Sequence, residues 1–249
     1  MRIFLYVFCV LLLLSCRTSS LYRGTKSANN PKVLSVPERT IIFSGYEWTV
    51  RDSRQKPQGP GGNIFAASKD NVWVDETGRL HLKITHRNGK WQCAEVRLKS
   101  PLGFGTYTFQ VQTDVSSLDE NVVAGFFTYL HDKAEIDIEL SKWSKPDNLN
   151  AQYVVQPAEK EGNIHRFDIA PAFDHTRHSF QWGAGSIHFK SSGFRNAAEQ
   201  TLSQWVYKGP DIPKEDKERL SINLWLYKGQ APKNAQEVEI IVNAVDFNP

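Results

Sequence analysis

The sequence is poor in sulfur: its 249 residues include only three cysteines and one methionine. Cys9 and Cys16 belong to the N-terminal apolar run and its end, which leaves Cys93 as the one cysteine of the remaining chain. A single cysteine cannot form an intramolecular disulfide, and Cys93 has no Cys or His neighbour at metal-ligand spacing. We therefore exclude a disulfide-stapled scaffold and predict that Cys93 is a small packing residue.

The chain also lacks a strong net charge. The formal charge is +3, and removal of residues 1–15, which contain one Arg and no acid, leaves 3 − 1 = +2. This balance is too mild to indicate binding of nucleic acid or attraction to an anionic membrane surface. Aromatic residues reach 12%, with seven Trp, which favours strands over helices. The length suits one large β domain or two small ones. The sequence shows no internal repeat and no second domain boundary, and we expect a monomer.

The N-terminal apolar run is too short to span a bilayer, which needs about 20 residues. It follows Arg2 and covers residues 3–14, the length of the apolar region of a secretory signal. It ends at Leu13-Leu14-Ser15-Cys16, which resembles the lipobox of bacterial lipoproteins. That resemblance implies a signal peptide of residues 1–15 and acylation of Cys16. The alternative is an ordinary signal peptide with a chance cysteine.

These features predict an exported protein of the cell envelope, anchored by lipid to a bacterial membrane or otherwise secreted. Residues 17–39 are polar and have no apolar period. We expect residues 16–39, the lipidated cysteine and this segment, to form a flexible tether. The folded domain is then residues 40–249.

Alternation of apolar and polar residues predicts many short strands in that domain. Residues 79–85 and 106–111 alternate strictly, and residues 121–129 form a more continuous apolar run that is typical of a strand buried on both faces. Further strands are expected at residues 152–156, 179–182, 187–190, 220–226 and 238–245. Only Pro213–Leu220 looks helical, and Gln55–Gly62 is a Pro- and Gly-rich loop. The pattern favours an all-β antiparallel sandwich.

The stretch from Ala134 to Leu140 alternates between acidic and apolar residues. On a strand, its three acids share one face, with neighbours about 6.6 Å apart. On a helix the middle acid would point roughly 200° away from the first. Two interpretations follow: an exposed acidic stripe on a solvated strand, or the paired carboxyl groups that glycoside hydrolysis uses. The acids are Glu135, Asp137 and Glu139.

The segment Glu135-Ile136-Asp137-Ile138-Glu139 resembles the signature of glycoside hydrolase family 16, which includes lichenases, laminarinases and xyloglucan transglycosylases. Further blocks follow the order of that family and extend the resemblance over residues 43–247. They are GGNIF at 61–65, AEVR at 94–97 with GFGTY at 103–107, FFTY at 126–129 and NLW at 223–225. The resemblance implies a β-jelly roll of two curved antiparallel sheets, with a cleft for a polysaccharide substrate on the concave one.

The resemblance also implies a mechanism that retains the anomeric configuration. Glu135 would be the nucleophile and Glu139 the general acid/base, and Asp137 would tune their ionisation. Retaining enzymes need the two carboxyl groups about 5–5.5 Å apart, whereas the Cα atoms lie about 13 Å apart on a straight strand. A strand bowed around a concave cleft would let two long Glu side chains lean together.

Sugar-binding residues are implied at Asn63, Glu95, Arg97 and Trp225. Structural roles stay open beside this, because Trp225 could belong to the core and Glu95 and Arg97 could pair with each other. His131 and Trp143 flank the acidic strand and are further candidates to line the cleft.

Two departures and one metal site complete the comparison with the family. Lys133-Ala134 stands where lichenases usually carry Trp-Asp, and the extra residue that laminarinase-type members insert before the second Glu is missing. Some members bind structural calcium, for which Asp246 and the carbonyl of Gly78 are candidates; no cofactor is expected to be required. The sequence thus predicts a retaining endo-β-glucanase, with a transglycosylase or a non-catalytic carbohydrate-binding lipoprotein as alternatives.

Overall fold

The computed structural model describes residues 38–171 and 173–249, which belong to one compact unit. The predicted signal peptide, Cys16 and the predicted tether up to residue 37 lie outside the described residues. Arg39, at the end of that tether, donates to the carbonyl oxygens of Ala67, Ser68 and Val72 at 2.7–3.1 Å. Within the described ranges, no helix has the length and apolar character needed to cross a membrane.

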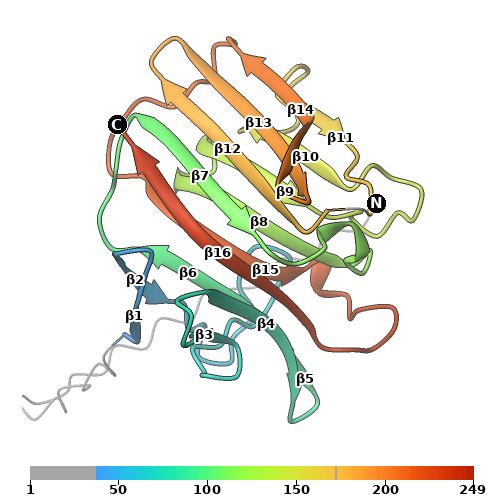
Figure 1. Ribbon diagram of the computed structural model, residues 1–249. Helices are drawn as coiled ribbons and strands as arrows, with labels where there is room; N and C mark the ends of the chain where they lie inside the picture. The colour runs from blue at the N-terminus through green and yellow to red at the C-terminus, as the bar shows by residue number, and fades with distance from the viewer. Residues whose placement is uncertain (1–37, 172) are drawn as a thin grey trace, which may run out of the picture. The chain divides into compact units, whose positions relative to one another are not determined.

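Two antiparallel sheets, one behind the other in Figure 1, make up this unit. The first has the order β1 (Thr40–Phe43), β2 (Tyr46–Val50), β6 (Ala94–Leu98), β15 (Arg219–Leu226), β8 (Val122–His131), β9 (Ala134–Leu140), β10 (Ala151–Val155) and β11 (Ile164–Phe167). The second has the order β14 (Ala198–Tyr207), β13 (Ser186–Arg195), β12 (His175–Gly183), β7 (Gly105–Val111), β16 (Val238–Asn248), β4 (Leu80–Arg87) and β3 (Val72–Val74), with β5 (Lys90–Gln92) paired to β4. Two 3-10 turns lie at Val115–Ser117 and Tyr227–Gly229.

Apolar side chains fill the space between the sheets. Phe109 of β7 lies 5.1 Å from Phe126 of β8, and Tyr153 of β10 lies 4.8 Å from Phe189 of β13, measured between ring centres. Each pair joins one sheet to the other. Because one face of the first sheet is used in this core, its other face is free to carry a site. The predicted all-β jelly-roll sandwich is confirmed.

The strands predicted from alternation are present, most of them shifted or extended by a few residues. The predicted helix at Pro213–Leu220 is wrong. Residues 213–218 form bends and irregular chain, and β15 begins at Arg219. The carboxylate of Glu218 accepts a hydrogen bond from the backbone N–H of Asp216 at 2.8 Å, a local bond that competes with helical pairing. Eight residues are also too few to form a stable helix without packing.

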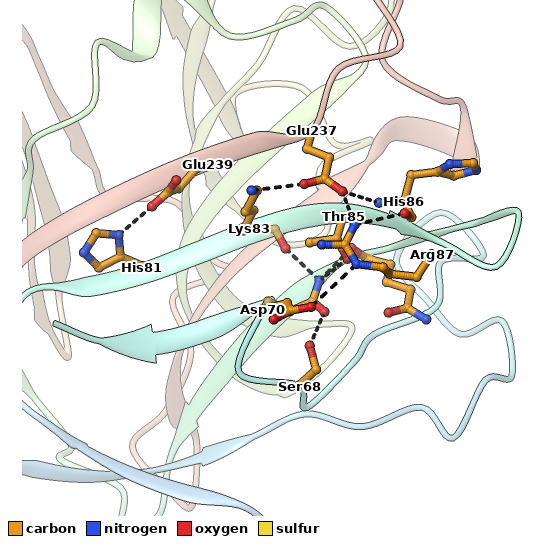
Figure 2. Close-up of polar contacts among 11 residues, drawn as sticks. Ser68, Asp70, His81, Lys83, Thr85, His86, Arg87, Glu237 and Glu239 are labelled. Atoms are coloured by element: carbon orange, nitrogen blue, oxygen red, sulfur yellow. Dashed lines mark hydrogen bonds and ion pairs between the residues drawn. The ribbon is translucent and has the colours of Figure 1, made fainter.

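Ion pairs join β4 to the residues just before β16 in the second sheet, as Figure 2 shows. Glu237 accepts hydrogen bonds from the backbone N–H of His86 at 3.0 Å and from Arg87, and it pairs with Lys83 at 3.0 Å. The bond from His86, followed by those from the two cations, lowers the pKa of Glu237 to about 2. These contacts hold β4 against the start of β16.

Candidate active site

The three predicted acids lie on one face of β9, and the alternating apolar residues lie on the other. Ile136, Ile138 and Leu140 are fully buried in the core. Asp137 is only 5% exposed, and Glu135 and Glu139 are partly buried. The pairing of β8 with β9 is irregular between Tyr129 and His131, directly beside Glu135. Such bulges bend a strand and are common next to active sites.

Strand register places the residues of the first sheet in rows that cross it through each acid. The row through Glu139 contains Gln152, Gly125, Asn223 and Glu95; the row through Asp137 contains Val154, Phe127, Ser221 and Arg97; and Tyr129 lies opposite Glu135. Most of these residues line an open cleft of about 450 Å3 together with the three acids. The predicted acidic face is therefore the floor of a cleft.

Glu135 and Asp137 are hydrogen-bonded to each other through their carboxyl groups. Two carboxyl groups can bond in this way only when one of them holds a proton. Burial raises the pKa of Glu135 to about 7, the bond from Asp137 opposes that rise, and the charge of Glu139 adds to it. Burial and the two neighbouring acids raise the pKa of Asp137 well above its usual range. Glu135 and Asp137 therefore share one proton, and burial favours keeping it in the pair.

Glu139 has different partners. Gln152 Nε2 donates to its Oε2 at 2.5 Å, and the side chain of Trp143 donates to the same carboxyl group. Burial raises the pKa of Glu139, while these two bonds and the charge of Arg166 act in the opposite direction. One strand face thus holds two glutamates in distinct surroundings, and Asp137 between them shares a proton with Glu135. That is the arrangement that acid/base chemistry with two carboxyl groups requires.

Three of the predicted sugar-binding residues lie in the cleft wall. Glu95 is 1% exposed and accepts hydrogen bonds from Arg51 at 2.6 Å and from Arg97 at 3.3 Å. The expected pairing of Glu95 with Arg97 is present, and Arg51 extends it. Trp225 also lines the cleft, with 8% of its surface exposed.

Asn63 does not line the cleft. It is 4% exposed, and its amide donates to the carbonyl oxygens of Pro60 and Leu226 at 2.9 and 2.8 Å. Its Oδ1 accepts a hydrogen bond from the buried, free thiol of Cys93 at 3.4 Å. With its donors and acceptor used in this way, Asn63 fastens the loop that borders the cleft. Cys93 is a packing residue, as predicted.

The predicted positions of His131 and Trp143 need the same correction. His131 is exposed at the end of β8, where its Nδ1 accepts from the backbone N–H of Lys133 at 3.3 Å. It does not line the cleft, and the bulge in β8 between Tyr129 and His131 interrupts the alternation that places Tyr129 there. Trp143 is buried and is not among the lining residues, although it contacts Glu139.

Several cleft residues were not predicted from the sequence. They are Arg51, Tyr129, Asp132, Gln156 and Asn223. Gln152, which contacts Glu139 without lining the cleft, was not predicted either. A signal for two of them exists: Gln152 and Gln156 have the same parity on the strand that follows the acidic one, so antiparallel pairing brings them to the acidic face. Gln156 Nε2 donates to Asp137 Oδ2 at 3.3 Å. Arg51 lies just past a strand end and has no such signal.

The predicted calcium ligands, Asp246 and the carbonyl of Gly78, stay a prediction. Asp246 is exposed on β16, where its carboxylate accepts from Gln110 Nε2 at 3.5 Å, and Gly78 lies in the turn between β3 and β4. No group of three or more His, Cys, Asp or Glu residues in ranges 38–171 and 173–249 could hold a metal ion. Calcium needs six to eight oxygen ligands, so we assign no step to a metal.

Solved glucanase structures share this fold. A β-glucanase from Bacillus licheniformis superposes with a TM-score of 0.62 and 19% identity over 86% of this chain and 99% of its own. A glycosyl hydrolase family 16 protein from Mycobacterium smegmatis superposes with a TM-score of 0.57 and 17% identity over 80% of this chain and 90% of its own. A pseudo-β-1,3-glucanase of Mycobacterium tuberculosis, described as an immunostimulatory antigen, superposes with a TM-score of 0.59 and 16% identity over 80% of this chain and 89% of its own. No family model and no curated protein matches the sequence. The likeness shows a shared fold.

Proposed function

We propose that this protein is a retaining, endo-acting glycoside hydrolase that cleaves a β-glucan-type polysaccharide. The observation that carries the proposal is the cleft floor, where Asp137 shares a proton with Glu135 and where Glu139 has hydrogen-bond donors of its own. The cleft is open along the sheet, which suits a polymer chain bound across its middle. The β-glucanases of the same fold support the choice of substrate class.

In the first step, the carboxylate of Glu135 attacks the anomeric carbon while Glu139 gives its proton to the leaving oxygen. Asp137 keeps its own proton and stabilises the ionised form of Glu135 by donating to it. In the second step, Glu139 takes a proton from water, and the water displaces Glu135 from the glycosyl-enzyme. Two inversions at one carbon retain its configuration.

The cleft wall provides the groups that bind a sugar chain. Trp225 offers a ring face for stacking, and Arg51 and Arg97 offer N–H donors that Glu95 holds in place. Asn223 contributes a buried carbonyl oxygen that has no partner among the described residues. A sugar hydroxyl would supply the missing hydrogen bond, because buried polar atoms are rarely left unpaired.

The test is release of reducing ends from a panel: mixed-linkage β-glucan, β-1,3-glucan, xyloglucan and a sulfated galactan. Wild type and Glu135→Ala run side by side. Without azide, we expect one polymer to be cleaved by the wild type and not by Glu135→Ala. Added azide should restore turnover to Glu135→Ala by taking the place of its carboxylate. Proton NMR of the first product that the wild type releases should show the β anomer. Initial formation of the α anomer from a β-linked polymer would refute the retaining mechanism.

Two alternatives are decided by the same panel. A transglycosylase would transfer the glycosyl group to a labelled acceptor oligosaccharide, so that longer products appear in place of reducing ends. A binding protein would cleave nothing and would bind one polymer equally well as wild type and as Glu135→Ala. The pseudo-glucanase of the same fold keeps the binding protein in view, whereas the intact acid set of this chain favours an enzyme.

We also propose that the protein is exported and anchored by lipid on Cys16, and that the domain acts as a monomer. The supporting observation is the apolar run of residues 3–14, which ends at Leu13-Leu14-Ser15-Cys16. Mass spectrometry of membrane-extracted protein should find an acylated N-terminal Cys16. The Cys16→Ser variant should leave the membrane fraction. Cleavage at another position would contradict the anchor.

A further inference from the structure

Both hydrogen-bond donors to Glu139 are in contact with one arginine. Gln152 and Trp143 donate to the Glu139 carboxyl group. Arg166 of β11 donates from Nε to Gln152 Oε1 at 3.0 Å, and its Cζ lies 5.0 Å from the centre of the Trp143 ring. Arg166 itself is fixed by a bond from Nη1 to Asn148 Oδ1 at 3.1 Å. Side chains of β10 and of the loop after β9 therefore meet at the Glu139 carboxyl group, and Arg166 of β11 contacts both of them.

Arg166 determines which end of the Gln152 amide faces Glu139. A guanidinium group can only donate, so the amide oxygen turns toward Arg166 and the NH2 group turns toward Glu139. Without Arg166 the amide could rotate by 180° and present its oxygen to the carboxyl group. That orientation would favour the protonated form of Glu139 only, since two bare oxygens repel.

Trp143 is held by its backbone as well as by Arg166. Trp143 and Ser144 have φ angles of 48° and 60°, in the left-handed region that residues with a side chain rarely adopt. The N–H of Trp143 donates to Ser141 Oγ at 2.9 Å, and that of Ser144 donates to Glu120 O at 2.7 Å. Strained backbone of this kind persists where the surroundings fix it, often at functional sites. Here it delivers the indole to Glu139, with the guanidinium on its face.

We propose that Arg166 is a positioning residue that acts on Glu139 through Gln152 and Trp143, so that one carboxyl group can serve as acid and then as base. The inference rests on the proposed function. The first step needs Glu139 with its proton, and the second needs it without. Burial favours the proton, and the two donors favour the carboxylate.

Few other charged groups face Glu139. Glu135 and Asp137 belong to its own strand, Glu95 lies beyond Asn223 in the same row, and Arg166 approaches from β11. The residues directly beside Glu139 on β8 and β10 are Gly125 and Gln152, which do not titrate. Arg166 is therefore the cation whose removal should move the titration of Glu139.

The first experiment does not depend on activity. Each tryptophan indole gives one 15N–1H NMR signal, and Trp143→Phe identifies that of Trp143. In wild type this signal should titrate with Glu139, and Glu139→Gln should abolish the transition. In Arg166→Met the midpoint should rise by about one pH unit. Arg177→Met is the matched control, since Arg177 lies 4.5 Å above the Phe194 ring on the second sheet; its midpoint should equal that of wild type.

The second experiment uses the polymer that the panel identifies. In Arg166→Met the alkaline limb of kcat/KM should move up with the midpoint, and kcat on the acidic side should fall because the base form of Glu139 is scarcer. Arg166→Lys keeps the charge but cannot stack a planar group on the Trp143 ring. Its pH profile of kcat/KM should therefore lie between those of wild type and Arg166→Met. An unchanged NMR midpoint in Arg166→Met would overturn the inference. A shifted midpoint in a chain that cleaves no polymer would uphold the network and reject the proposed function.

Discussion

Replacing Glu135 by glutamine should stabilise the folded protein above neutral pH. The pKa of Glu135 is about 7 in the folded chain, against an ordinary value of 4.5. A carboxyl group with a raised pKa binds its proton more tightly when folded, so the free energy of unfolding falls as pH rises from 4.5 to 7 and is level above that. At 1.36 kcal/mol per pH unit, the loss is at most about 3 kcal/mol.

Glutamine carries no charge at any pH, so Glu135→Gln should not show this loss. The variant and the wild type should have similar unfolding free energies at pH 4, and the variant should be more stable by up to about 3 kcal/mol at pH 8. Urea denaturation followed by tryptophan fluorescence at pH 4, 5, 6, 7 and 8 measures the difference. In Glu135→Gln, Asp137 and Glu139 should also contribute less to the pH dependence of the free energy of unfolding, because each loses a charged neighbour.

Glu76→Gln is the control, because Glu76 is exposed in the turn before β4, on the other sheet. It should follow the wild-type curve within about 0.5 kcal/mol at every pH. The reasoning would be refuted if the gap between Glu135→Gln and wild type stayed constant from pH 4 to pH 8, or if it closed with rising pH. Either result would mean that the cleft does not disfavour the ionised form of Glu135.

Three further changes test the cleft wall and the second sheet. Gly125→Ala should lower kcat/KM about tenfold without unfolding the protein, because the new Cβ would lie 2.5 Å from Asn223 Oδ1 and would displace it. Glu95→Gln should cost about 2 kcal/mol in urea denaturation, because it leaves Arg51 without its buried partner. Glu237→Gln should lower stability at pH 7 by about 1 kcal/mol and should flatten the loss between pH 4.5 and pH 2, because the depressed pKa of Glu237 contributes stability only while it is ionised.

Matched controls keep these outcomes specific. Gly185→Ala adds a Cβ with nothing within 4 Å, so it should leave kcat/KM unchanged. Glu47→Gln breaks an exposed ion pair with Lys99, in which both side chains are 46% exposed, and should cost less than about 0.5 kcal/mol. Equal effects of Glu95→Gln and Glu47→Gln would contradict the buried role of Glu95. If Glu237→Gln and wild type lost the same stability between pH 4.5 and pH 2, the role of Glu237 would be contradicted.

The acidic strand could be predicted from the sequence because its acidic and apolar residues alternate with the period of two that is typical of a strand. Glu135, Asp137 and Glu139 needed only the alternation to be placed on one face, and β9 has the predicted bounds. The sequence also predicted half of the strands of the first sheet and most of those of the second, since half-buried strands alternate. The strands that it missed are β1, β2, β3, β5, β6, β11 and β14. The first four residues of β14 are all exposed at a sheet edge, so that burial imposes no pattern on them.

The partners of the acids could not be predicted, because they come from distant parts of the chain and are set by strand order. Arg166 reaches Glu139 only because β11 pairs with β10 and β10 with β9. Trp143 was expected in the cleft from its nearness in sequence, yet the left-handed turn after β9 carries it beneath Glu139. Asn63 matched the family by position, and its hydrogen bonds to Pro60 and Leu226 depend on a loop whose path the sequence does not determine.

The same alternation that reveals the acidic face also makes it rigid. A slip of one residue in the pairing of β9 would move three carboxyl groups into the core and three fully buried apolar side chains into the cleft. Each buried carboxyl group would then face apolar side chains alone, which costs far more than its present position among Gln152, Gln156 and Trp143. Register is therefore enforced from both faces at once. The core fixes the backbone of β9, and this holds Glu135 and Glu139 in the constant relation that the proposed mechanism needs.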